Sequence, residues 1–132
     1  MSAPATASAQ ETVDALFAAL DALDTTAMAA LLGDDPQGVD ELSGGWRRGR
    51  AALDDYLATL ERSGIANIRS TLTDSRLVEW GDTALATMVL DQAYTLDGED
   101  RAIHAPTTLV LRREAGTWRI VLVHTVPTSD GA

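Results

Sequence analysis

Only a few side chains in this 132-residue chain are suited to acid–base chemistry. The two histidines are His104 and His124, and Asp91 and Tyr94 lie close together on one predicted strand. A general base must lie within hydrogen-bond reach of the proton that it removes, and carboxylates and imidazoles are the usual choices. One hypothesis is therefore a catalytic set in which Asp35 or Asp91 is the base and His104 and Tyr94 are hydrogen-bond donors.

The segment from 33 to 49 is rich in glycine, aspartate and proline, which is typical of a loop. Asp35 and Asp40 could act as a base by position, but the simpler interpretation of the segment is a solvated acidic cluster. No calcium-loop spacing is present, and two histidines alone do not support a metal site. The sequence therefore predicts no metal and no cofactor. The acidic residues of the segment are Asp34, Asp35, Asp40 and Glu41.

The composition argues against several classes of partner. Ten basic and twenty acidic residues leave a formal net charge of −10, which is unfavourable for nucleic acids and anionic membranes because both attract clustered cations. No apolar run approaches the ~20 residues of a membrane span. The absence of cysteine and of a signal-peptide pattern favours the cytoplasm. The one dense basic run, at 47–50, is interpreted as a solvated approach to a helix and not as a phosphate site.

Apolar residues recur at helical spacing through the first half of the chain. Ser8 and Glu11 fit a capping box at the start of the first helix. Three helices are expected: one from this cap to about residue 23, a short one that starts after Asp24 or Thr25 and ends at Gly33, and one over about 50–63. Between the last two, the sequence predicts a loop with one short strand over about 39–43.

After Gly64 the apolar period changes from helical to two, which indicates strands. Four strands are expected over about 67–79, 83–95, 101–113 and 117–126. Helices followed by a run of strands indicate a segregated α+β domain. The predicted domain covers 10–127, with a disordered tail over 1–9 and a C-terminal tail over 128–132.

The last strand is apolar on both faces, although one face of an antiparallel sheet can usually remain in water. Alternation assigns Val121 and Val123 to one face. Helices can cover one face, and a second copy of the chain is the simplest cover for the other. The sequence therefore predicts a homodimer. The predicted interface residues share the opposite face of this strand: Trp118, Ile120, Leu122 and His124.

Strand parity also predicts a pocket. Pairing the last two strands about Ala115 places Thr107 opposite His124, and the same parity groups His104 with Gln92. Apolar walls with a few polar tips are typical of small-molecule pockets. Trp46 could be a lid, a dimer anchor or a loop-packing residue. The predicted pocket residues are Phe17, Trp46, Tyr56, Met88, Leu90, Gln92, Tyr94, His104, Thr108 and Val110.

Three motifs follow one another in a fixed order: Gly49-Arg50-Ala51-Ala52-Leu53, Trp80-Gly81-Asp82 and Gly116-Thr117-Trp118, with His124 six residues after the tryptophan. This order resembles the nuclear transport factor 2-like superfamily over about residues 10–127. The resemblance is greatest to the branch of the polyketide cyclase SnoaL, ketosteroid isomerase and the association domain of the calmodulin-dependent kinase.

The resemblance implies an α+β, cone-shaped fold, in which a strongly curved mixed or antiparallel sheet wraps around three N-terminal helices (a cystatin-like α+β roll). It does not imply one function, because this superfamily includes enzymes, ligand carriers and assembly modules. Isomerase chemistry of this kind needs a tyrosine on the first helix, and this chain has Phe17 there. Pro106 and Val126 also replace polar residues common in the branch, an arginine and a serine.

The leading hypothesis is a cytoplasmic homodimer that binds a small apolar or amphipathic organic molecule in a largely apolar cavity, with no assignable catalytic set. The first alternative is an isomerase, cyclase or dehydratase of the ketosteroid isomerase or SnoaL kind that acts on a hydrophobic small molecule. The second is an oligomerisation module with a vestigial pocket.

Overall fold

The computed structural model describes residues 8–40 and 44–128. Within these ranges the helices are α1 (Ala9–Asp21), α2 (Thr25–Ala30) and α3 (Arg50–Arg62). The strands are β1 (Leu32–Asp40), β2 (Gly45–Arg48), β3 (Ile65–Trp80), β4 (Thr83–Leu96), β5 (Glu99–Glu114) and β6 (Thr117–Thr125). The predicted tails lie mostly outside the described residues, but Ala9 is already fully buried in α1. No helix of the described chain is long and apolar enough to cross a membrane.

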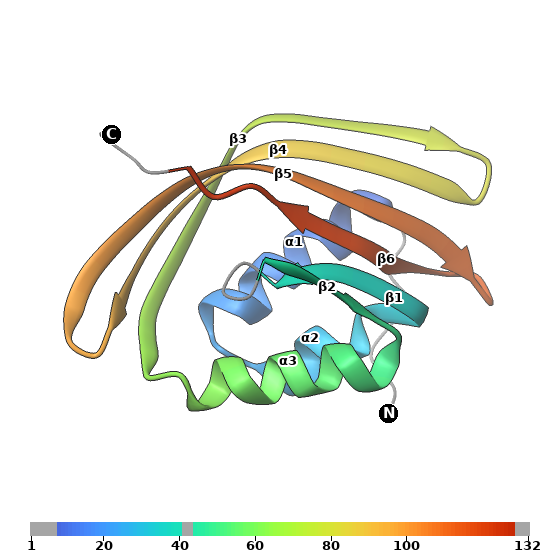
Figure 1. Ribbon diagram of the computed structural model, residues 1–132. Helices are drawn as coiled ribbons and strands as arrows, with labels where there is room; N and C mark the ends of the chain where they lie inside the picture. Colours follow the sequence, from blue (N-terminus) through green and yellow to red (C-terminus); the bar gives the residue numbers. More distant parts are fainter. Residues whose placement is uncertain (1–7, 41–43, 129–132) are drawn as a thin grey trace.

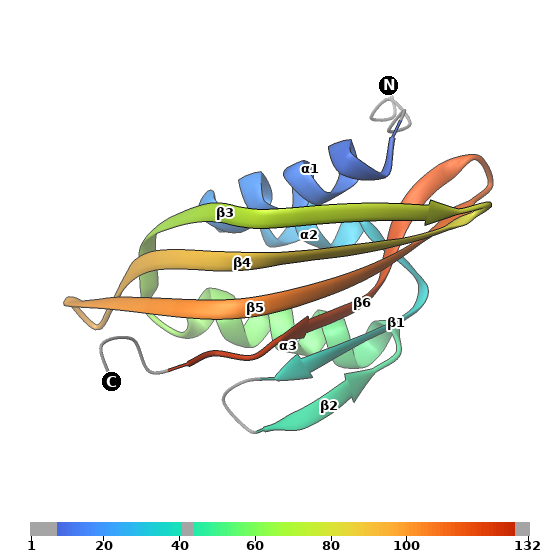
Figure 2. The same ribbon diagram turned by 90° about the horizontal axis from the view of Figure 1, so that it is seen from above.

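The six strands form one curved sheet in the order β2-β1-β6-β5-β4-β3. Strands β3 to β6 are an antiparallel meander, and β1 pairs with β6 in parallel, so the sheet is mixed. The sheet arches over the three helices, which all lie on its concave side (Figures 1 and 2). This arrangement confirms the predicted α+β cone with a strongly curved sheet.

The predicted caps at Ser8 and Asp24 are confirmed, and in the predicted capping box the Glu11 side chain accepts from the Ser8 hydroxyl, at 3.3 Å, in place of the Ser8 amide. The Ser8 side chain accepts a hydrogen bond from the Glu11 amide at 3.1 Å, and Asp24 accepts one from the Ala27 amide at 3.0 Å. Each cap satisfies an amide that the first turn of its helix leaves without a partner. Helix α2 is shorter than predicted, because Leu32 is already the first residue of β1.

The segment predicted to be a loop over 33–49 instead forms most of the β1–β2 hairpin. Only part of the short strand predicted over 39–43 coincides with β1, and residues 41–43 lie outside the described ranges. The segment has no alternating apolar pattern, so its strand conformation comes from pairing with β6. At Gly33 this pairing is close, because a Cβ there would lie 2.9 Å from Val121 Cγ1 and from Glu114 Oε2.

Two-residue turns join the long strands and fix their register. The β4–β5 turn is Asp97-Gly98, and both residues have a positive φ, at 52° and 81°. A type I′ hairpin turn requires this conformation, and Asp-Gly is one of its preferred sequences. The turn pairs Leu96 with Glu99, and the regular ladder that follows pairs Asp91 with His104.

A β-bulge at Val121 reverses the facing of residues within β6. Leu111 pairs with Ile120, but Val110 pairs with Leu122, so Val121 is the additional residue on β6. Trp118 and Ile120 therefore point into the core and are 3% and 0% exposed. Their assignment to the interface was wrong.

Because of the same bulge, the predicted pairing of the residues that follow Val121 was wrong by one residue. Thr107 pairs with Thr125, and His124 pairs with Thr108. Leu122 and His124 therefore share the convex face of the sheet, which we call the outer face. Val123 and Thr125 face the helices.

The buried core lies between α1 and the centre of the sheet. Val13, Leu16 and Phe17 pack in one cluster with Leu109 and Leu111. Thr12 is fully buried, and its hydroxyl donates to the Trp118 carbonyl at 3.3 Å. These contacts fix α1 across β6 and leave the other end of the concave side open for a cavity.

The bulge predicts unequal losses of stability when two nearby aliphatic residues of β6 are shortened. Replacing the buried Ile120 with alanine should lower the free energy of unfolding by about 2–5 kcal/mol, because it leaves a cavity in the core. Leu122→Ala should cost much less, since Leu122 is only partly buried on the outer face. Urea unfolding of both variants at low protein concentration would measure this difference. Equal losses would contradict the bulge.

Candidate functional site: a cavity under the sheet

A cavity of about 580 Å³ lies between the helices and the concave face of the sheet. Its wall is mostly apolar, and α1, α3, β1, β4, β5 and β6 all contribute to it. The apolar part includes Leu16, Phe17, Leu20, Met28, Leu57, Leu60, Leu90, Ile103 and Val123. The polar part includes Asp40, Tyr56, Gln92, Tyr94, Thr107 and Thr125.

Half of the predicted pocket residues line this cavity, namely Phe17, Tyr56, Leu90, Gln92 and Tyr94. Gln92 is held by a short polar chain: its amide donates to Ser70 Oγ at 3.1 Å, and Ser70 Oγ donates to Asp21 Oδ1 at 2.6 Å. Met88 is buried in the core on the same face of β4 and does not line the cavity.

The other predicted pocket residues lie on the outer face. The Asp97-Gly98 turn pairs His104 with Asp91, so alternation puts His104, Thr108 and Val110 on the side away from the helices. Trp46 also lies there, with its ring centroid 5.8 Å from that of His124. Assigning these four residues to the cavity was wrong. For His104, Thr108 and Val110 the reason is that the β4–β5 turn is shorter than the predicted strand bounds implied, and for Trp46 it is that the predicted loop is strand β2.

The structure brings two of the predicted catalytic residues, Asp91 and His104, into contact, but it does not bring the full set together. His104 Nδ1 lies 2.7 Å from Asp91 Oδ1, and both side chains are about half exposed on the outer face. Tyr94 lines the cavity on the opposite side of the sheet, and Asp35 is exposed in a shallow hollow beside Val110. One small substrate could not contact this set, because the sheet itself separates its members.

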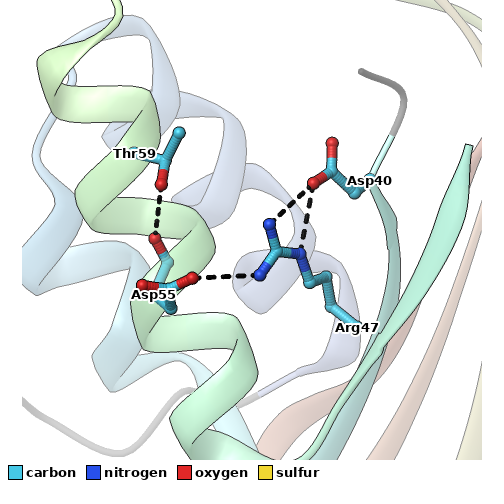
Figure 3. A network of polar contacts seen from close by, with 4 residues as sticks. All are labelled: Asp40, Arg47, Asp55 and Thr59. Carbon is cyan, nitrogen blue, oxygen red and sulfur yellow. Dashed lines mark hydrogen bonds and ion pairs between the residues drawn. The ribbon is translucent and has the colours of Figure 1, made fainter. Parts of the chain in front are cut away.

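The buried carboxylate of the cavity is Asp40, which is 4% exposed at the end of β1. Arg47 on β2 donates to Asp40 Oδ2 from Nη2 at 2.9 Å and from Nε at 3.1 Å. Its Nη1 donates to Asp55 Oδ2 on α3 at 3.0 Å. Thr59, one turn further along α3, donates to the Asp55 backbone carbonyl at 3.0 Å, as Figure 3 shows.

Hydrogen bonds with Asp40, and then with Asp55, raise the pKa of Arg47 above its ordinary value, so the guanidinium remains charged. Asp40 had been interpreted as part of a solvated cluster, and this pair was not predicted. A usable signal was present, because Gly44-Gly45 between the two residues is a hairpin signal. Pairing Gly38 with Arg47 then points Arg47 toward α3.

The other arginines of the basic run contact their own chain. Arg48 donates to Gln37 Oε1 at 3.0 Å, and its guanidinium lies 5.1 Å from the centre of the Trp46 ring. Arg50 donates to the Ala29 carbonyl at 2.8 Å. Both arginines therefore contact groups of their own chain. Among the described residues, no group of three or more acidic, histidine or cysteine side chains could hold a metal ion.

Residues 9–127 match the family described as the SnoaL-like domain. A putative dehydratase of the nuclear transport factor 2-like family from Streptomyces avermitilis is similar in structure, with 21% identity, a TM-score of 0.79 and coverage of 90% of this chain and 93% of that chain. A putative calcium/calmodulin-dependent protein kinase type II association domain from Thiobacillus denitrificans has 27% identity, a TM-score of 0.74 and coverage of 96% and 100%.

A ketosteroid isomerase-like protein from Erwinia carotovora atroseptica has 19% identity, a TM-score of 0.77 and coverage of 91% and 93%. No curated protein matches the sequence. The likenesses below 25% identity show the fold alone.

The Asp40–Arg47 pair predicts a non-additive double variant. Arg47→Met should lower the urea midpoint, because it leaves the buried Asp40 carboxylate without its cation. Adding Asp40→Leu should recover part of the loss, since no buried charge then remains. Arg48→Met, at the exposed neighbour, is the matched control and should stay close to the wild type. If the loss in the double variant equals the sum of the losses in Arg47→Met and in Asp40→Leu measured alone, the coupling of the pair is contradicted.

Proposed function

Because the chain belongs to the SnoaL-like domain family, we propose that it binds a small organic molecule with a hydrophobic body in the cavity, and that it does so as a homodimer. The observation that carries the proposal is the cavity itself, with its volume of about 580 Å³ and its mostly apolar wall. Small-molecule sites commonly have volumes of roughly 300–1,000 Å³ and such a lining.

The few polar groups of the wall are suited to orienting a ligand. Ser70 and Asp21 hold the Gln92 amide in place, and Tyr94 lies two residues further along the same face of β4. Asp40 lies across the cavity on β1. A ligand that buried its apolar part among the leucines could therefore direct a polar group to either wall.

A second copy of the chain is the proposed cover of the outer face. No helix lies on this side of the sheet in Figures 1 and 2, yet Leu85, Val89, Val110 and Leu122 form an apolar set on it. Trp46, which is 46% exposed, extends this set beside His124. Of the interface residues predicted from the sequence, Leu122 and His124 thus remain in the proposed interface. The similar Thiobacillus protein is named as an association domain, which also supports assembly.

An enzyme of the isomerase or dehydratase kind is the second candidate. The observation that favours it is the buried Asp40 carboxylate in the cavity wall, together with relatives named as a putative dehydratase and as ketosteroid isomerase-like. Against it, Arg47 already places two donors on Oδ2 of Asp40. Ligand binding is therefore the preferred function over catalysis. Separately, the location in the cytoplasm stays a prediction from the sequence.

Filling the cavity should abolish binding. N-phenyl-1-naphthylamine is a neutral apolar dye whose fluorescence rises in a dry pocket, and it should titrate to one site per chain. Ile103→Trp places an indole in the cavity wall and should remove most of the signal. Ala102→Trp adds the same ring at the exposed neighbouring position and should leave the titration unchanged. Loss of the signal in both variants, or in neither, would contradict binding in this cavity.

A charge on the outer face should separate the dimer. Leu122→Glu would bury a carboxylate in the proposed interface, where an unpaired charge is costly. The expected result is a monomer by sedimentation equilibrium, with dye binding kept because Leu122 faces away from the cavity. Ala51→Glu, at an exposed position of α3, is the control and should remain a dimer. A wild-type chain that is itself monomeric at micromolar concentration would refute the proposed assembly.

A further inference from the structure

The charged side chains that line the cavity are all acidic. Among the described residues of the wall they are Asp40 and Asp97, and no arginine or histidine belongs to it. The whole chain contains no lysine, and the residues outside the described ranges contain no basic side chain. The residues of this sequence outside the described ranges therefore add no arginine, lysine or histidine side chain to this wall.

Arg47 is shared between one carboxylate of the wall, Asp40, and one outside it, Asp55. The group of three therefore carries two negative charges and one positive charge, a formal sum of −1. Figure 3 shows Arg47 between Asp40 and Asp55 of α3. Arg47 itself is not among the residues that line the cavity.

The second carboxylate belongs to the turn between β4 and β5. Asp97 lies against the end of α3, where a Cβ at Gly64 would be 2.8 Å from Asp97 Oδ1. Gly64 has a φ of +87°, so a side chain there would be strained as well as crowded. Asp97 thus adds an exposed carboxylate to the cavity wall.

Positive charges elsewhere are directed away from the cavity. Arg50 and Arg119 donate to the backbone carbonyls of Ala29 and Ala30, and Arg48 lies on Trp46 at the outer face. His104 pairs with Asp91 on the outer face as well. None of these groups offers a counter-ion to an anion in the cavity.

We propose that this cavity selects ligands by the sign of their charge, taking a hydrophobic body that bears a protonated amine and rejecting carboxylates and phosphates of the same shape. The inference rests on the proposed binding function and specifies its ligand. An anion would lose its hydration beside a group of net negative charge, in a site where charges interact more strongly than in water. An ammonium group would instead gain an ion pair with the acidic wall.

Three adamantane derivatives with one apolar body test the proposal. 1-Adamantylamine, 1-adamantanol and adamantane-1-carboxylate compete with N-phenyl-1-naphthylamine for the wild-type protein at pH 7. The amine should displace the dye at about tenfold lower concentration than the carboxylate, which corresponds to about 1.4 kcal/mol. The alcohol should lie between them.

Two variants assign the preference to the wall. Asp40→Asn should reduce the ratio of the carboxylate concentration to the amine concentration that displaces the dye. Asp97→Asn should reduce this ratio less, because Asp97 is exposed to solvent. Asp54→Asn removes an exposed carboxylate of α3 that does not line the cavity, so its ratio should stay that of the wild type. If Asp40→Asn does not fold, the comparison of Asp97→Asn with Asp54→Asn decides.

The outcomes separate the two proposals. A dye that fails to bind the wild type overturns the proposed function. A dye that binds, but that the carboxylate displaces as well as the amine does, overturns charge selection and leaves the binding function in place. An amine preference that persists in both wall variants overturns the role of Asp40 and Asp97.

Discussion

The bulge at Val121 is the constraint on which the arrangement of this protein depends. Strand β6 pairs with β5 on one side and with β1 on the other, so it lies inside the sheet and helps to form both faces. Before the bulge, Trp118 and Ile120 face the helices and complete the core. After it, Val123 and Thr125 face the helices and line the cavity. One extra residue thus lets a single strand serve the core at one end and the pocket at the other.

Much of the fold follows from local signals that the sequence states directly. The caps at Ser8 and Asp24 and the glycine after α3 set the helices, and the change of period after Gly64 sets the meander. The family resemblance inferred from ordered motifs is confirmed over residues 9–127. These features depend on near neighbours in the chain, and such signals can be interpreted without knowledge of the tertiary structure.

The missed features depend on how strands pair, which the composition of each segment does not reveal. Strand β1 has a loop-like composition and is extended because β6 offers it hydrogen bonds. The pair of Asp40 and Arg47 needs the β1–β2 hairpin before its members can meet. The cavity assignments of His104, Thr108 and Val110 failed because the length of one hairpin turn was misjudged, since a one-residue change of register moves every later side chain to the other face. The Asp97-Gly98 dipeptide is a preferred two-residue turn sequence, but the sequence alone also allowed a longer turn over 96–100.

The register of β4 and β5 also changes what the proline at position 106, a departure from the family pattern, implies. Pro106, where an arginine is common in the branch, pairs with Val89 and lies on the outer face. The replacement of arginine by proline therefore removes a positive charge from the surface proposed to bind a second copy, where an unpaired charge would be costly. In the cavity, the scarcity of cations arises differently: the one arginine that reaches its edge is already engaged by Asp40 and Asp55. The apolar set on the outer face and the lack of an arginine among the described residues of the cavity wall thus both depend on where this chain places its ten arginines, since it has no lysine.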